Sequence, residues 1–107
     1  MTMRLPDFFI VGAPKSGTTA LHAYLGRHPS IFVPARKEPH FFGSDIVSPA
    51  FVRDRDAYLS LFAGATTEAR VGEASIWYLY SKRAAREIKE FNPDARIIIM
   101  LRNPVDM

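Results

Sequence analysis

The sequence contains no cysteine, which excludes disulfide bridges and allows a reducing compartment, so we expect a cytoplasmic location. It also lacks any apolar stretch near the ~20 residues that a membrane span requires. The apolar run at residues 8–11 is short and leads directly into a glycine loop, which makes a secretory signal the weaker alternative. Acidic excess is absent as well. The net charge of +3 permits an anionic ligand, but it does not by itself argue for a nucleic-acid partner.

What is present is the composition of one small globular domain: 107 residues, of which 48% are hydrophobic. Apolar runs predict strands, and apolar residues at helical spacing predict helices between them. The expected strands are residues 8–12, 70–74 and 96–101, with a short extended piece at 31–33. The expected helices are 18–27, 49–63 (opened by Ser48 and Pro49) and 82–91 (capped by Ser81). This alternation is typical of an α/β fold with a parallel sheet.

The loop after the first strand has the character of an anion site. Gly12 ends the strand, Gly17 lies in the loop, and Thr18 and Thr19 open the next helix. A helix start offers unpaired N–H groups and the positive end of the helix dipole, and glycine lets the backbone approach a ligand closely. The stretch therefore predicts a site for phosphate or sulfate, with Lys15 as its cation.

The spacing differs from that of the nucleotide-triphosphate loop G-x-x-x-x-G-K-[ST]. Gly12 and Gly17 have the right separation, but Thr18 occupies the lysine position and the lysine has moved back to Lys15. The strand that would carry a magnesium-binding aspartate is followed by Arg102 instead. These two cations favour a ligand with two phosphate-type groups and no metal. A nucleotide kinase or NTPase with a deviant loop is the alternative.

Three segments together resemble the sulfotransferases that use 3′-phosphoadenosine 5′-phosphosulfate (PAPS). Residues 12–19 (GAPKSGTT) resemble their 5′-phosphosulfate loop, and residues 101–105 (LRNPV) resemble the start of their 3′-phosphate motif. Residues 37–42 (KEPHFF), here called the base segment, resemble the segment that carries the catalytic base in the carbohydrate branch, including heparan sulfate O-sulfotransferases and bacterial relatives. The resemblance implies a P-loop NTPase-like three-layer fold. It also implies that residues 1–107 are the N-terminal part of a single sulfotransferase domain, which we expect to be interrupted after a core strand.

The resemblance assigns the donor site residue by residue. Lys15 would contact the bridging oxygen and the 5′-phosphate of PAPS and stabilise the leaving phosphate as charge develops on it. Arg102 would bind the 3′-phosphate, although the serine that normally follows in this motif is absent. The remaining predicted donor ligands are Ser16, Gly17, Thr18 and Thr19, and no metal is expected.

On the acceptor side, Glu38 matches the general base that takes the proton of an acceptor hydroxyl. His40 would orient the base or the acceptor, and Lys37 would help to hold an anionic, carbohydrate-type acceptor. The alternative is a charged loop that Phe41 and Phe42 anchor in the core.

Other residues have simpler interpretations. The vertebrate heparan-type enzymes have lysine where Ala74 stands, which argues against a heparan-like acceptor. Glu73 is either a second acid near the site or, as we favour, a strand-end residue. His22 and His28 have no cysteine or carboxylate partners at metal-ligand spacing and are interpreted as helix-surface residues. A chain that only binds nucleotide is a further alternative, and the sequence assigns no oligomeric state.

Overall fold

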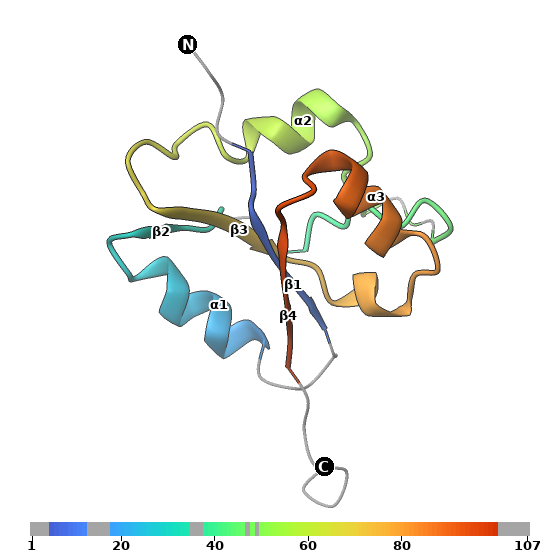
Figure 1. Cartoon of the computed structure of the whole chain (residues 1–107), viewed down its shortest axis with the longest axis horizontal. Coiled ribbons are helices and arrows are strands. Elements are labelled where there is room, and N and C mark those ends of the chain that lie inside the picture. The colour runs from blue at the N-terminus through green and yellow to red at the C-terminus, as the bar shows by residue number, and fades with distance from the viewer. Residues whose placement is uncertain (1–4, 13–17, 35–37, 47, 49, 101–107) are drawn as a thin grey trace, which may run out of the picture.

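A computed structural model of the chain contains one four-stranded parallel sheet with strand order β2-β3-β1-β4 (Figure 1). The structure describes residues 5–12, 18–34, 38–46, 48 and 50–100. The strands are β1 (Phe8–Gly12), β2 (Ile31–Phe32), β3 (Arg70–Ala74) and β4 (Arg96–Ile99). The strand at 8–12 is therefore confirmed and lies between two partners, as its unbroken apolar run predicts for a strand covered on both faces.

Alternate residues of β1 divide the core into two layers. Phe9 and Val11 belong to one buried cluster, whereas Phe8 and Ile10 belong to a second cluster on the opposite face. Helix α1 (Thr18–Gly26) covers the second cluster through Leu21 and Leu25. The sheet is thus covered on both sides, which stabilises the fold mainly by removing apolar surface from water.

The other face of the sheet is covered by three short helical elements: α2 (Arg55–Ser60), the 3₁₀ helix η1 (Ile76–Tyr80) and α3 (Ala84–Phe91). Figure 1 shows α1 on one side of the sheet and α2 and α3 on the other. Tyr58 of α2 and Ile88 of α3 are buried in the cluster that contains Phe9. The predicted three-layer α/β arrangement is confirmed. None of the described helices is long and apolar enough to cross a membrane.

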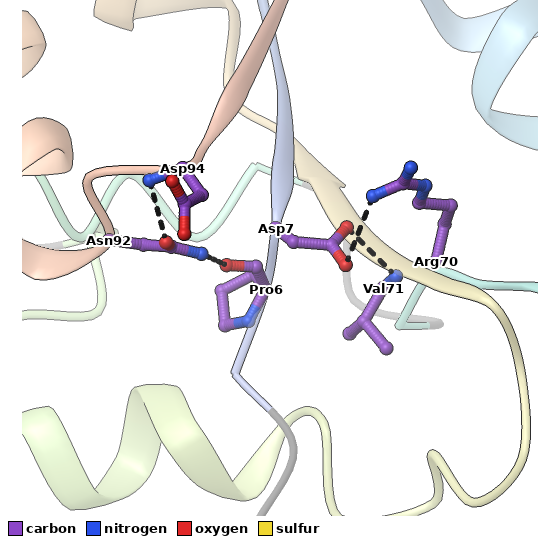
Figure 2. Close-up of polar contacts among 6 residues, drawn as sticks. All are labelled: Pro6, Asp7, Arg70, Val71, Asn92 and Asp94. Atoms are coloured by element: carbon purple, nitrogen blue, oxygen red, sulfur yellow. Dashed lines mark hydrogen bonds and ion pairs between the residues drawn. The ribbon is translucent and has the colours of Figure 1, made fainter.

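Polar contacts hold the amino-terminal edge of the sheet together (Figure 2). The Asp7 carboxylate accepts from the amide of Val71 and lies 3.9 Å from the Arg70 guanidinium. Asn92, at the end of α3, donates its side-chain amide to the carbonyl of Pro6. These contacts leave the opposite, carboxyl edge to the loops that carry the candidate site.

Two helices begin later than expected from the sequence, and α2 also ends earlier than expected, at Ser60. The helix expected over 49–63 begins only at Arg55, because Asp54 supplies the N-cap and its carboxylate accepts from the amide of Ala57 at 2.9 Å. Helix α3 begins at Ala84, two residues later than expected, although the hydroxyl of Ser81 does accept from the Ala84 amide at 2.9 Å.

Two burial expectations were wrong. Strand β4 was expected to be buried, but it lies at an edge of the sheet, and Ile97 and Ile99 are 48% and 49% exposed. His22 was expected at the helix surface, but it is buried on α1, whereas His28 is exposed after the helix, as expected. The sequence of an element shows how apolar its side chains are, but it does not show which neighbouring elements cover them in the fold.

Candidate functional site

The candidate site lies at the carboxyl edge of the sheet, where β1, β3 and β4 end. The carbonyl of Gly12, the last residue of β1, accepts from the amide of Met100 at 2.8 Å, so β1 and the chain leaving β4 meet there. Helix α1 begins at Thr18. A strand, a short connection and a helix start form the arrangement that suits a phosphate or sulfate group.

Several predicted site residues fall outside the described residues. These are Lys15, Ser16, Gly17, Lys37 and Arg102, and their roles stay predictions. Thr18 and Thr19 form the first turn of α1, where backbone N–H groups lack partners within the helix. Gly12, the first residue of the predicted 5′-phosphosulfate loop, and Met100, which directly precedes the predicted 3′-phosphate motif, are the hydrogen-bonded pair described above.

Gly12 has a positive φ of 148° at the point where the anion loop begins. A Cβ atom there would lie 3.0 Å from the carbonyl oxygen of Ile76 and 3.1 Å from the Cβ of Leu79. The 3₁₀ helix η1 therefore packs directly against the end of β1. Glycine at this position is required by this close approach as well as by the backbone conformation.

Glu38 is attached to the same edge of the sheet. Its amide donates to the carbonyl of Ala74 at 2.9 Å, and Ala74 pairs in register with Ile10 of β1. The Glu38 side chain is partly exposed, and its φ is +56°. The structure thus places the predicted base at the sheet edge where the predicted donor loop begins.

His40 faces the interior, with 3% of its surface exposed. Its Nε2 accepts from the amide of Trp77 at 3.3 Å, and its ring packs on Phe51 with centroids 4.5 Å apart. Burial lowers the pKa of His40 to about 4, outweighing a hydrogen bond with the Glu38 backbone, which acts in the opposite direction. The His40 imidazole is neutral and buried, and it is hydrogen-bonded to the Trp77 amide and to the Glu38 backbone. It therefore suits the role of orienting the base better than that of contacting an acceptor.

The two phenylalanines of the base segment are anchored in the core. The ring of Phe41 stacks on Tyr58 with centroids 4.3 Å apart, and Phe42 is buried among aromatic rings of α3 and η1. Phe41 and Phe42 therefore do anchor the segment in the core, as the alternative interpretation of a charged, core-anchored loop expects. It also fixes the backbone that presents Glu38, so the anchor and the base role do not exclude each other.

Glu73 lies one residue before the end of β3, as the favoured strand-end interpretation expects, but its burial was not predicted. It is 1% exposed, and its carboxyl group contacts the hydroxyls of three side chains: Tyr58, Ser75 and Tyr78. Burial raises the pKa of Glu73, and the three hydrogen bonds counteract part of this effect.

Histidine, aspartate and glutamate are the described residues that could form a metal site with oxygen or nitrogen ligands. The described part of the chain contains no group of three or more such residues that could hold an ion. The residues that the sequence predicts to hold an anionic donor lie at the start of α1 and, outside the described residues, in the segment before it.

Comparison with known proteins identifies the family. The model of the sulfotransferase family matches residues 6–85, which is more than half of the chain. The chain belongs to this family. The predicted resemblance is thereby confirmed.

Sulfotransferases from other organisms match across nearly the whole chain. The membrane-associated sulfotransferase kil1 of Dictyostelium discoideum is 32% identical over 95% of this chain and 21% of its own length. Human heparan sulfate glucosamine 3-O-sulfotransferase 6 is 33% identical over 95% of this chain and 28% of its own length. The chain therefore spans less than a third of these two sulfotransferases.

A solved sulfotransferase supports the fold. The crystal structure of a sulfotransferase from Alicyclobacillus acidocaldarius superposes with a TM-score of 0.90 and 44% identity, covering 96% of this chain and 47% of that protein. The predicted P-loop NTPase-like α/β fold is confirmed by this likeness. The names of two relatives, heparan sulfate glucosamine 3-O-sulfotransferase 6 and carbohydrate sulfotransferase 15, refer to carbohydrates. This is consistent with the carbohydrate branch that the base segment resembles.

Proposed function

We propose that the protein transfers a sulfuryl group from PAPS to a hydroxyl of a carbohydrate acceptor. The observation that carries the proposal is the attachment of Glu38 to the carboxyl end of β3, at the sheet edge where Gly12 opens the predicted donor loop. Membership of the sulfotransferase family supplies the reaction class. The carbohydrate acceptor is proposed from relatives such as human carbohydrate sulfotransferase 15.

The donor residues follow from the three motifs. PAPS supplies an activated sulfuryl group whose transfer breaks a sulfur–oxygen bond to phosphate and forms one to the acceptor oxygen. Lys15 stabilises the charge that develops on the leaving phosphate, and Arg102 binds the 3′-phosphate. The donor is also held by the loop and helix start, through Ser16, Gly17, Thr18 and Thr19.

On the acceptor side, Glu38 takes the proton that the hydroxyl loses as the new bond forms. Lys37 holds an anionic group of the acceptor. His40 acts by orienting Glu38, a role that its burial and its bonds to Trp77 and to the Glu38 backbone support. Ala74 provides no cation, so the proposal names a carbohydrate without assigning heparan sulfate.

A titration with adenosine 3′,5′-bisphosphate (PAP) tests the proposal. PAP should bind with equal affinity in magnesium and in EDTA, and ATP should bind weakly in both. Magnesium-dependent binding of ATP in preference to PAP would instead support the nucleotide kinase or NTPase alternative. The cytoplasmic location expected from the sequence stays a prediction.

A further inference from the structure

The described part of the base segment, residues 38–42, adopts an unfavourable backbone. Glu38 and His40 have φ values of +56° and +50°, in the left-handed region that non-glycine residues rarely occupy. Residues held in this region are conformationally strained and persist only where the surroundings hold them. Something outside the segment must therefore fix its conformation.

The hydrogen-bond partners of the segment show what holds it. The amide of Glu38 donates to the sheet, through the Ala74 carbonyl. The other amides donate to two side-chain hydroxyls: His40 to Ser75 Oγ at 3.0 Å, and Phe41 and Phe42 to the Tyr78 hydroxyl at 3.0 and 3.3 Å. Pro39 has no amide hydrogen to donate.

The direction of these bonds is fixed by chemistry. A backbone N–H can only donate, so the oxygens of Ser75 and Tyr78 must accept from the base segment. Their own hydrogens are then free to point elsewhere, and both point to Glu73. Tyr78 donates to Glu73 Oε2 at 2.9 Å, and Ser75 donates to Glu73 Oε1.

We propose that Glu73 is a positioning residue for the base segment. Its two carboxyl oxygens orient the Ser75 and Tyr78 hydroxyls so that these accept from the amides of His40, Phe41 and Phe42. This chain of bonds holds the strained backbone that presents Glu38. The inference rests on the proposed function for its catalytic meaning, but the arrangement itself involves only described residues.

An acid suits this position better than an amide would. Glu73 is fully enclosed, so a hydroxyl that lost its acceptor there would find no water in its place. Glutamine offers one accepting oxygen and one donating nitrogen, so it can satisfy Ser75 or Tyr78 but not both. The geometry therefore requires two acceptor atoms on one side chain.

Hydrogen exchange of the segment's amides tests the arrangement without any enzyme assay. Tyr78→Phe removes the acceptor of Phe41 and Phe42, and Ser75→Ala removes the acceptor of His40. Each change should speed exchange of the amides it frees by about fivefold or more, since a lost hydrogen bond is worth on the order of 1 kcal/mol. Amides in the β1–β3 ladder should keep their rates.

Tyr58→Phe is the matched control. It also removes a phenolic hydroxyl from Glu73, but the Tyr58 hydroxyl makes no hydrogen bond with the amides of residues 38–42, so exchange of these amides should stay within about twofold of wild type. Glu73→Gln should speed exchange at His40 or at the Phe41–Phe42 pair. Should this variant fail to fold, the comparison of Tyr78→Phe with Tyr58→Phe still decides.

Two results separate this inference from the proposed function. Wild-type exchange at Phe41 and Phe42 in the Tyr78→Phe variant would overturn the positioning role. Failure of the wild type to bind PAP would overturn the proposed function and would leave the exchange pattern unchanged. Where turnover is measured, Tyr78→Phe should lower kcat by about tenfold or more with PAP affinity unchanged, and Tyr58→Phe should alter neither.

Discussion

The amide of Glu38 donates to the carbonyl of Ala74 at 2.9 Å, while Ala74 itself pairs with Ile10 in the centre of the sheet. The predicted base is thus one hydrogen bond away from a buried pair of strands. A residue on a connection between elements gains a fixed position in this way, because the sheet is rigid and the connection is held to it at a defined register.

Replacing Glu38 with glutamine tests its role as the base. The substitution keeps the size of the side chain but removes its capacity to take a proton, so turnover should fall by about 10²–10⁴-fold. PAP affinity should change little, because Glu38 is assigned to the acceptor side. Steady-state sulfation by the protein that the whole gene encodes, with Glu90→Gln on the exposed face of α3 as the control, checks this. An unchanged rate in Glu38→Gln would remove the residue from the mechanism.

Lys15→Ala should affect the donor side instead. The lysine is assigned to the developing charge on the leaving phosphate, and loss of one such donor typically costs about 10²–10³ in kcat. The exposed Lys89 of α3 offers a matched control, and Lys89→Ala should retain wild-type turnover. Substantial turnover in Lys15→Ala would reject the assignment of the loop lysine.

The fold was largely predictable because its strongest signals are local. The apolar run of β1 and the glycine that ends it predicted the central strand and the loop before α1. The start of α2 was missed because Ser48 and Pro49 look like a helix opening, whereas Asp54 makes the actual cap. The exposure of β4 was missed because an apolar run does not show how many strands flank it.

The site was predictable only where a motif carries it. Glu38 was assigned as the base through its neighbours in the base segment, and this role stays a prediction. The contacts of Glu73 were not predictable, because its partners Tyr58 and Tyr78 lie on different helical elements, and their convergence exists only in the folded chain. The burial of His40 was missed for the same reason, since Phe51 and Trp77 approach it from separate segments.

The depressed pKa of His40 predicts a pH dependence of stability. With a pKa near its usual 6.5 in the unfolded chain and about 4 in the fold, His40 binds more protons when unfolded between these values. The free energy of unfolding should therefore fall as pH drops from 6.5 towards 4, with a contribution of at most about 1.4 kcal/mol per pH unit. Above pH 6.5 this contribution should be constant.

Urea unfolding at several pH values measures this dependence. His40→Gln supplies the comparison, because glutamine can still accept from the Trp77 amide but does not titrate. Its stability should vary less with pH over this window. Equal slopes in His40→Gln and wild type would contradict the assigned pKa.

The contact between Gly72 and Phe8 predicts a large effect of a single methyl group. These two residues pair across β3 and β1, and a Cβ atom on Gly72 would lie 2.3 Å from the Phe8 ring. Gly72→Ala should therefore lower the free energy of unfolding by about 1–3 kcal/mol through overpacking. Gly64→Ala, whose Cβ would lie 3.3 Å from the Phe32 ring, should cost less.

Chemical denaturation of the single and double variants measures this coupling. Phe8→Leu leaves space beside Gly72, so Gly72→Ala should cost less in the Phe8→Leu background than in wild type. Strict additivity of the two substitutions would mean that the strand shifts to accept the methyl group without pressing on the ring. Because Phe8 also packs with Ile10 and Ala74, a shift at Gly72 would reach the carbonyl that holds Glu38 and should appear in the exchange rate of the Glu38 amide.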